Sequence, residues 1–250
     1  HKMNKNNLKV VILAGGYGTR LGTLTKLKPK PMVDVCGKPI IEHIIQLYLK
    51  SGFSNFIICG GYKIDVIKNY FTKKFKKNIS LNHKNETFIK KNNFSIRIVN
   101  TGKNSLTGGR IKRIRKYVEK DAFFHMTYGD GLSNVDINKL TKFHLKNKKL
   151  ATVTTVKIQV PQERFGVVYF KNKNTVKEFV EKPDIKEIFI NGGFFVLNSK
   201  IFKFIKDDFT RWEAKPLERI AKQKQLAAFK HTGFWKCMDT IRDRKYLEQF

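Results

Sequence analysis

Cysteine is scarce in this chain of 250 residues, with three at positions 36, 59 and 237. They lie far apart, are odd in number, and show neither zinc-site spacing nor a C-x-x-C pair, which argues against a disulfide framework and a structural zinc site. No apolar run approaches the roughly 18 residues that a membrane-spanning helix needs, and no signal-like hydrophobic stretch follows the first residues. We therefore expect a cytoplasmic protein with reduced thiols and no membrane partner.

Acidic residues are also few, 20 Asp and Glu against 51 Lys and Arg, so the formal net charge is +31. Such a charge is typical of proteins that bind nucleic acids or anionic surfaces. However, the basic residues are 41 Lys and 10 Arg, whereas proteins that read base edges favour Arg for its bidentate geometry. Because the lysines are spread along the chain, we interpret most as solvated surface residues and expect no specific nucleic-acid partner. A weak, salt-sensitive polyanion site is the alternative.

The rest of the composition, 41% hydrophobic and 12% aromatic residues, is that of a globular protein. A chain of this length can bury a large core, and no linker or internal repeat divides it. We expect one domain at 3–250, with a first part at 8–158 and a second part at 159–250.

Apolar runs alternate with amphipathic stretches over the first part. The run 8–14 is continuous and ends at Gly15, as is typical of a buried parallel strand that leads into a glycine loop. This alternation predicts an α/β fold with a doubly wound, mostly parallel mixed sheet of the Rossmann-like type, and a ligand crevice at the carboxyl ends of the strands. The expected strands are 8–14, 55–59, 96–99, 122–128 and 151–158, and the expected helices are 39–50, 65–71, 110–118 and 137–146.

From residue 164 onward the pattern is richer in strands, which suggests a small β-rich extension over the crevice. The densest lysine cluster lies in the region 71–95, which we expect to be loop. The expected later strands are 165–170, 175–180, 189–197, 226–230 and a run ending at 238, and the expected later helices are 216–224 and 241–250.

The glycine loop after the first strand reads Leu13-Ala14-Gly15-Gly16-Tyr17-Gly18-Thr19-Arg20-Leu21. It is not the dinucleotide fingerprint, which needs a third glycine where Leu21 stands, nor a Walker loop, which needs Gly-Lys-Ser/Thr. Free backbone N–H groups beside the Thr19 hydroxyl and the Arg20 guanidinium still suit a phosphate-bearing ligand. A tight turn between strand and loop, without a ligand, is the alternative.

A second cationic segment, Lys28-Pro29-Lys30-Pro31, follows ten residues later. Its two prolines fix an extended backbone and limit where the ammonium groups can point. A cation aimed in this way beside a phosphate loop suits the departure of pyrophosphate. Lys182 likewise stands at a strand end before a proline. Accidental lysines on the surface of a lysine-rich chain are the alternative in both places.

Two aspartates are candidates for a metal site. Asp130 lies between Gly129 and Gly131 at the end of a predicted buried strand, where an unpaired carboxylate is costly. Asp239 follows another strand-like run. Two carboxylates from separate strand ends suit Mg²⁺, which is held by one or two carboxylates plus substrate phosphates. A solvent-facing turn for Asp130 and a helix N-cap at Asp239 are the alternatives.

Together and in this order, five segments resemble the motifs of the sugar-1-phosphate nucleotidyltransferases. The resemblance runs from about residue 8 to the C-terminus. It implies a Mg²⁺-dependent reaction in which a sugar-1-phosphate oxygen attacks the α-phosphorus of a nucleoside triphosphate and pyrophosphate leaves. The five segments are 13–21, Lys28-Pro29-Lys30-Pro31-Met32, Gly129-Asp130-Gly131, Glu181-Lys182-Pro183 and Asn191-Gly192-Gly193-Phe194.

The resemblance also implies a role for each matching residue. Arg20, Lys30, Asp130 and Asp239 would be catalytic, and the two aspartates would bind the metal. The first part of the chain would hold the nucleotide and the second the sugar phosphate. The residues on the nucleotide would be Leu13, Ala14, Gly15, Gly16, Tyr17, Gly18, Thr19, Arg20, Lys30, Ser105, Arg110 and Gly129, and those facing the sugar phosphate would be Tyr128, Glu181, Lys182, Asn191 and Gly193.

Within that family, Asn100-Thr101-Gly102 and the segment 105–113 resemble the base-proximal region of the cytidylyltransferases that act on glucose 1-phosphate. This implies CTP and glucose 1-phosphate as substrates, a homo-oligomer, and CDP-glucose as a precursor for deoxysugars of surface polysaccharide such as the O-antigen of lipopolysaccharide. The same chemistry with another nucleotide or another phosphorylated acceptor is one alternative. A non-catalytic scaffold that binds polyanions is the other.

Overall fold

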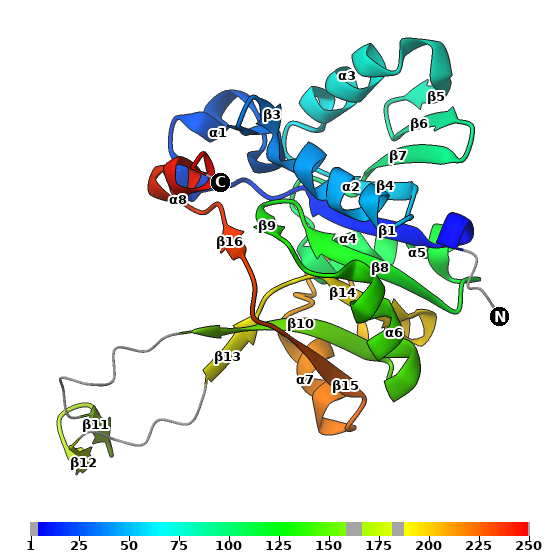
Figure 1. Ribbon diagram of the computed structural model, residues 1–250. Coiled ribbons are helices and arrows are strands. Elements are labelled where there is room, and N and C mark those ends of the chain that lie inside the picture. The colour runs from blue at the N-terminus through cyan, green and yellow to red at the C-terminus, as the bar shows by residue number, and fades with distance from the viewer. Residues whose placement is uncertain (1–4, 159–166, 182–187, 250) are drawn as a thin grey trace.

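A ten-stranded mixed sheet forms the centre of the protein (Figure 1). The computed structural model describes residues 5–158, 167–181 and 188–249. The strands of the sheet are β1 (Lys9–Ala14), β4 (Asn55–Gly60), β5 (Ile79–His83), β6 (Glu86–Lys91), β7 (Phe94–Asn100), β8 (Phe123–Tyr128), β10 (Ala151–Ile158), β13 (Ile188–Asn191), β14 (Phe195–Asn198) and β15 (Leu226–His231).

The strand order is β13-β10-β14-β8-β1-β4-β7-β6-β5, with β15 also paired to β10. The central strands β8, β1, β4 and β7 are parallel, so their carboxyl ends meet at one edge of the sheet. The strands β14 and β6 attach to this parallel group antiparallel. Within the described ranges, three pairs of strands lie outside the large sheet: β2 (Asp34–Val35) with β3 (Lys38–Pro39), β9 (Gly131–Ser133) with β16 (Trp235–Cys237), and β11 (Val167–Phe170) with β12 (Val176–Val180).

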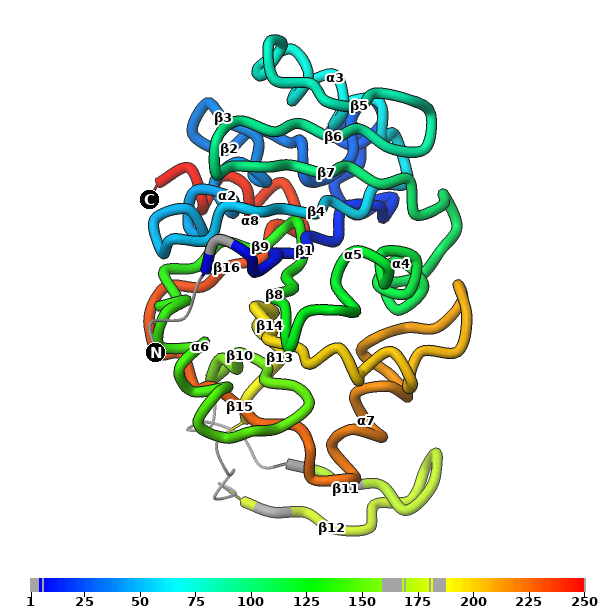
Figure 2. The backbone as a smooth tube through the Cα atoms, turned by 90° about the vertical axis from the view of Figure 1, so that its right-hand side faces the viewer, coloured from blue at the N-terminus to red at the C-terminus, as the bar shows by residue number. Residues whose placement is uncertain are grey.

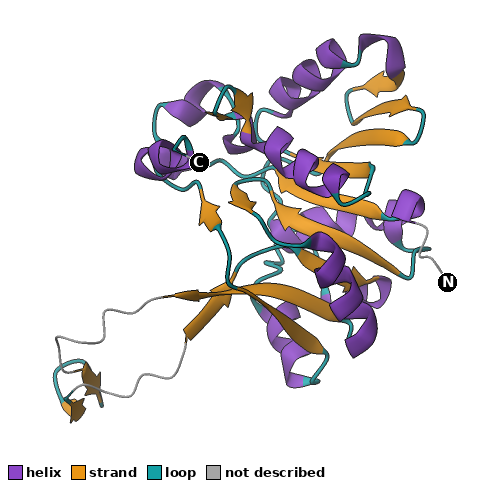
Figure 3. Cartoon of the chain, in the orientation of Figure 1, coloured by secondary structure: helices purple, strands orange, loops and turns teal. Residues whose placement is uncertain are grey.

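Helices cover both faces of the sheet (Figure 3). In Figure 2, α2 and α6 lie to one side of the central strands, and α4, α5 and α7 lie to the other. The α-helices are α1 (Leu24–Leu27), α2 (Ile40–Lys50), α3 (Ile64–Lys74), α4 (Thr107–Arg113), α5 (Arg115–Val118), α6 (Ile137–Asn147), α7 (Lys215–Lys222) and α8 (Ile241–Leu247), and the 3₁₀ helices are η1 (Lys5–Asn7), η2 (Thr19–Leu21), η3 (Lys30–Met32), η4 (Lys76–Asn78) and η5 (Ser199–Phe204).

Alternate side chains of the central strand β1 enter two separate cores. Val10 and Ile12 belong to the core that includes residues of α2, α3 and α6. Val11 and Leu13 belong to the core on the opposite face, together with Ile111 of α4. Both sets are needed because a strand covered by helices on two faces must be apolar at every position. The predicted doubly wound α/β fold is therefore confirmed. In the part of the chain that the structure describes, no helix is both long and apolar enough to cross a membrane.

Two predicted elements are each divided in the structure. The helix expected at 110–118 consists of α4 and α5, because the backbone at Ile114 (φ −97°, ψ 6°) leaves helical geometry. The strand expected at 189–197 is two strands, β13 and β14, which pair with different parts of β10. Between them Gly193 (φ 73°) and Phe194 (φ 44°) adopt left-handed conformations that interrupt the extended backbone.

The region 71–95 contains a hairpin where loop was expected. β5 and β6 pair antiparallel at the edge of the sheet. Thr87 and Ile89 of β6 are fully buried, whereas Lys90 and Lys91 are exposed. The lysines hide the short alternating pattern in the sequence, which is why composition alone indicated a loop. The strands β13, β14 and β15 belong to the central sheet. Among the described residues after 164, the strands outside that sheet are β11 and β12, which pair with each other, and β16, which pairs with β9.

Candidate active site

A cavity of about 420 Å³ opens where β1 and β8 end. Its position follows from the topology, because the crevice of a doubly wound sheet lies at the carboxyl ends of the parallel strands. Every residue that the sequence predicts on the nucleotide lines this cavity. The remaining lining residues are Pro31, Leu106, Thr107, Tyr128 and Asp130.

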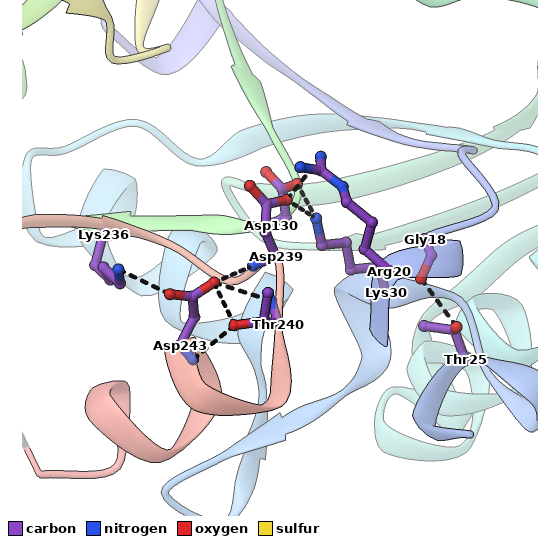
Figure 4. Close-up of polar contacts among 9 residues, drawn as sticks. All are labelled: Gly18, Arg20, Thr25, Lys30, Asp130, Lys236, Asp239, Thr240 and Asp243. Carbon is purple, nitrogen blue, oxygen red and sulfur yellow. Dashed lines mark hydrogen bonds and ion pairs between the residues drawn. The ribbon is translucent and has the colours of Figure 1, made fainter. Parts of the chain in front are cut away.

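The glycine loop is held from two sides. Gly18 has a left-handed backbone (φ 63°), and its carbonyl accepts a hydrogen bond of 3.0 Å from the Thr25 hydroxyl (Figure 4). On the other side the Tyr17 hydroxyl donates to Asn104 at 2.8 Å, and the Tyr17 ring contacts that of Tyr62 with centroids 5.0 Å apart. These contacts fix the loop as one wall of the cavity.

A cluster of two cations and two carboxylates stands beside this wall (Figure 4). The Lys30 ammonium donates to Asp130 at 2.8 Å and to Asp239 at 2.6 Å. The Arg20 guanidinium lies 3.1 Å from the same Asp239 carboxylate. Lys30 is nearly buried, with 11% of its side chain exposed, whereas Arg20 is 72% exposed. The cluster is therefore charge-balanced, and Arg20 has room to move toward a ligand.

The electrostatics of the cluster keep Lys30 charged. Burial opposes the charge of its ammonium group, but the carboxylates of Asp130 and Asp239 outweigh burial and raise the Lys30 pKa above its ordinary value. A charged ammonium group in the wall of this cavity is suited to binding an anionic ligand.

The pairing of β9 with β16 brings the two aspartates together. Gly131 of β9 lies opposite Cys237 of β16, and the Met238 amide donates to the Asp130 carbonyl at 2.8 Å. Asp239 is not the N-cap of α8, because Thr240 takes that position in a capping box with Asp243.

Arg110 is buried and faces backbone carbonyls. Its guanidinium donates to the carbonyls of Gly15 at 2.9 Å and Gly102 at 2.7 Å, and to the Thr101 hydroxyl at 3.0 Å. Burial is the main reason that its pKa is lowered. The residue thus joins the loops that follow β1 and β7 beneath the cavity that it lines.

A second cavity of about 190 Å³ lies next to the first. The two share Arg20, Tyr128 and Asp130. Asn191 and Gly193, predicted on the sugar phosphate, line it together with Tyr128. Glu181, predicted with them, is exposed and does not line it, and Lys182 lies outside the described residues. The lining residues that the motifs do not single out are Thr127, Gly131, Gly192, Phe194, Trp235 and Cys237.

The donor chemistry of the cluster fits a divalent cation such as Mg²⁺. Asp130 and Asp239 converge on one cation, the Lys30 ammonium, and each carboxylate has a second oxygen that accepts no hydrogen bond from the described residues. Cys237 lines the second cavity beside them, but burial raises its pKa to about 12, so the thiol stays protonated. No set of three or more His, Cys, Asp or Glu able to hold a metal occurs in the described ranges. The two carboxylates would therefore hold such a cation together with oxygens of the substrate.

The chain is similar to proteins of a known family over almost its whole length. The family description "Nucleotidyl transferase" matches residues 9–240. The chain belongs to this family. It is 44% identical to a glucose-1-phosphate cytidylyltransferase of Salmonella typhimurium, covering 96% of this chain and 95% of the relative. It is 38% identical to a probable glucose-1-phosphate cytidylyltransferase of Bacillus subtilis, covering 94% and 93%. The resemblance drawn from the motifs is thereby confirmed, and this chain is a nucleotidyltransferase.

Solved structures agree with this assignment. HddC from Yersinia pseudotuberculosis, complexed with GMP-PN, superposes on the nucleotidyltransferase with a TM-score of 0.69 at 25% identity, covering 97% of this chain and 98% of that one. A putative glucose-1-phosphate thymidylyltransferase from Bacillus anthracis superposes with a TM-score of 0.70 at 21% identity, covering 97% and 94%. The second likeness shows the fold alone.

Proposed function

We propose that this nucleotidyltransferase joins CTP to α-D-glucose 1-phosphate, giving CDP-glucose and pyrophosphate, with Mg²⁺ as its metal. The product would supply activated glucose for deoxysugars of surface polysaccharide. The observation that carries the chemistry is the cluster of Arg20, Lys30, Asp130 and Asp239 at the junction of the two cavities. The 44% identical relative supports the choice of substrates.

The reaction needs no general base. A phosphate oxygen of the sugar phosphate forms a bond to the α-phosphorus, and the bond from that phosphorus to the oxygen bridging it to the β-phosphorus breaks. The bond electrons leave on pyrophosphate. Because the attacking oxygen is already an anion, the protein has to position two anionic substrates and stabilise the charge that develops.

The residues of the junction suit this task. The glycine loop would present backbone N–H groups to the triphosphate. Lys30 lines the first cavity and contacts the two aspartates that line the second. Its ammonium group would exchange part of its contact with the aspartates for contact with the phosphates. Arg20 lines both cavities and is exposed enough to follow the transferring group. A bound Mg²⁺ on Asp130 and Asp239 would neutralise triphosphate charge and polarise the α-phosphorus.

The nucleotide is the substrate most in need of a test. Mannose-1-phosphate guanyltransferases are also similar to this chain, one of Candida glabrata at 29% identity, and HddC was solved in complex with GMP-PN. A site built to hydrogen-bond one base edge can discriminate by up to roughly 10⁴ to 10⁵. The specificity of the chain should therefore be measurable as a large ratio.

The experiment is pyrophosphate release by the purified protein with Mg²⁺, crossing CTP, UTP, dTTP, ATP and GTP with glucose 1-phosphate, mannose 1-phosphate and galactose 1-phosphate. We expect signal with CTP and glucose 1-phosphate, and CDP-glucose by mass spectrometry. A preference for another pair would replace the substrates but keep the chemistry. Silence with every pair would refute the proposal and favour the non-catalytic scaffold.

The metal is tested separately by binding. Mn²⁺ titration followed by electron paramagnetic resonance, with CTP present, should show a protein-bound ion in the wild type. Asp130→Asn and Asp239→Asn should each weaken its binding by more than about tenfold. Asp65→Asn, at an exposed position of α3, is the matched control. Equal Mn²⁺ binding by all four proteins would show that these aspartates hold no metal.

A further inference from the structure

Glu213 connects the two cavities, although no sequence motif singles it out. One of its carboxylate oxygens accepts a hydrogen bond of 2.7 Å from the Tyr128 hydroxyl, and the other accepts one of 2.6 Å from the Thr107 hydroxyl. Thr107 lines the first cavity, and Tyr128 lines both. Glu213 itself lines neither, so it can act on a ligand only through these two residues.

The fold holds Glu213 in this place through the start of α4. The amide of Gly108 donates to the carbonyl of Thr210 at 2.9 Å. A Cβ atom on Gly109 would lie 2.3 Å from the carbonyl oxygen of Asp208, so only glycine lets this loop approach. Trp212, next to Glu213, is fully buried. The glycine pair in the segment Thr107-Gly108-Gly109-Arg110 thus serves to seat the loop that carries Glu213.

The hydrogen bonds of both hydroxyl groups have a fixed direction. A carboxylate only accepts, so the Tyr128 and Thr107 protons are both committed to Glu213. Asn191 donates to the Tyr128 oxygen at 3.2 Å, and the Trp212 amide donates to the Thr107 oxygen at 2.9 Å. Neither hydroxyl has a proton left for a ligand. Toward the cavities each hydroxyl oxygen can only accept a hydrogen bond. A sugar hydroxyl can donate such a bond, whereas an ionised phosphate oxygen cannot.

The wall of the second cavity therefore carries two groups of unlike chemistry, both shared with the first cavity. Tyr128, with Glu213 behind it, offers an acceptor and a nearby negative charge. Arg20 offers a cation toward the junction.

We propose that Glu213 is a positioning residue that turns the Tyr128 hydroxyl into an acceptor, so that a sugar phosphate binds with a hydroxyl group at Tyr128 and its phosphate at Arg20. The proposal rests on the proposed function in taking a sugar phosphate as the occupant of the second cavity. It adds that a hydroxyl group of the ligand faces Tyr128 and its phosphate faces Arg20, because Glu213 leaves the Tyr128 hydroxyl able only to accept a hydrogen bond.

The first test is a double-mutant cycle with Glu213→Gln and Tyr128→Phe, using the wild type's best substrate pair. Each single variant should lower kcat/KM for the sugar phosphate about tenfold, roughly the value of one hydrogen bond between neutral groups. The double variant should fall no further, because both changes remove the same interaction. Glu218→Gln, an exposed glutamate on α7, is the control and should stay within about twofold of the wild type. Multiplication of the two single effects in the double variant would overturn the proposal.

The second test identifies the sugar hydroxyl that donates to Tyr128. For the wild type, one of the monodeoxy analogues of the sugar phosphate should have a kcat/KM about tenfold lower than that of the parent sugar phosphate. For Glu213→Gln, the same analogue and the parent should have similar kcat/KM values. A role of Glu213 in holding the loop alone would lower the melting temperature and leave this ratio unchanged, which would refute the proposal. If the wild type uses no sugar phosphate, the proposed function fails. If the wild type is active and Glu213→Gln equals it in both tests, only the positioning role fails.

Discussion

Lys28 and Lys30 form a matched pair for mutation, because they occupy equivalent places in Lys28-Pro29-Lys30-Pro31 but have different surroundings. Lys28 makes an ion pair of 2.8 Å with Asp34 at the surface, with 35% of its side chain exposed. Lys30 is 11% exposed and bridges the two aspartates of the candidate active site. Replacement by methionine keeps most of the length of either side chain and removes its charge together with its hydrogen-bond donors.

We expect Lys30→Met to lower kcat/KM by about 10²- to 10³-fold, the usual cost of removing one group that stabilises transition-state charge, equivalent to about 3–4 kcal/mol. Lys28→Met should stay within about twofold, because an exposed ion pair contributes about 0–1 kcal/mol. Neither change should unfold the protein, since both aspartates that lose Lys30 are partly exposed to water.

Steady-state pyrophosphate release with each substrate varied in turn measures both variants, and urea unfolding checks their stability. Comparable losses in Lys28→Met and Lys30→Met would mean that total positive charge, not the buried bridge, drives the reaction. Retention of more than a tenth of wild-type kcat/KM by Lys30→Met would refute its placement on the transferring phosphates.

Two further predictions concern buried cations and histidines. Burial lowers the pKa of His144 to about 4 and of His125 to about 3, while the unfolded chain takes up their protons from about pH 6.5 downward. The free energy of unfolding should therefore fall as the pH drops from 6.5 to 4, by up to about 1.4 kcal/mol per pH unit for each histidine. In urea titrations at several pH values, this fall should be shallower for His144→Gln than for the wild type. Equal dependence on pH in the two proteins would contradict this prediction. Arg110→Lys should lower the free energy of unfolding by about 2–4 kcal/mol, because buried carbonyl groups lose their hydrogen-bond donor. The control Arg113→Lys, at an exposed position, should lower it by less than about 1 kcal/mol. Equal urea midpoints for the two variants would show that the carbonyl groups do not depend on Arg110.

Local patterns in the sequence determined most of the elements. The apolar run that became β1 and the helical spacing that became α2 are properties of neighbouring residues, so they can be read without knowing the fold. The contiguous glycine loop could likewise be placed at the crevice, because its residues follow the central strand directly. Local patterns failed where the structure at a residue depends on segments that are distant in the sequence. Ile89 is buried in β6 although lysines follow it, and Gly193 separates two strands that pair with different parts of β10.

The tertiary structure alone decided which side chains share the site and in what state. Asp130 and Asp239 meet because β9 pairs with β16, a contact between segments about a hundred residues apart that no spacing rule expresses. Lys30 differs from Lys28 only through burial and through those aspartates. Glu213 reaches Tyr128 only because a distant glycine pair lets its loop approach. Each of these outcomes depends on distances of a few ångströms between residues far apart in the chain, and the order of amino acids does not specify such distances until the chain has folded.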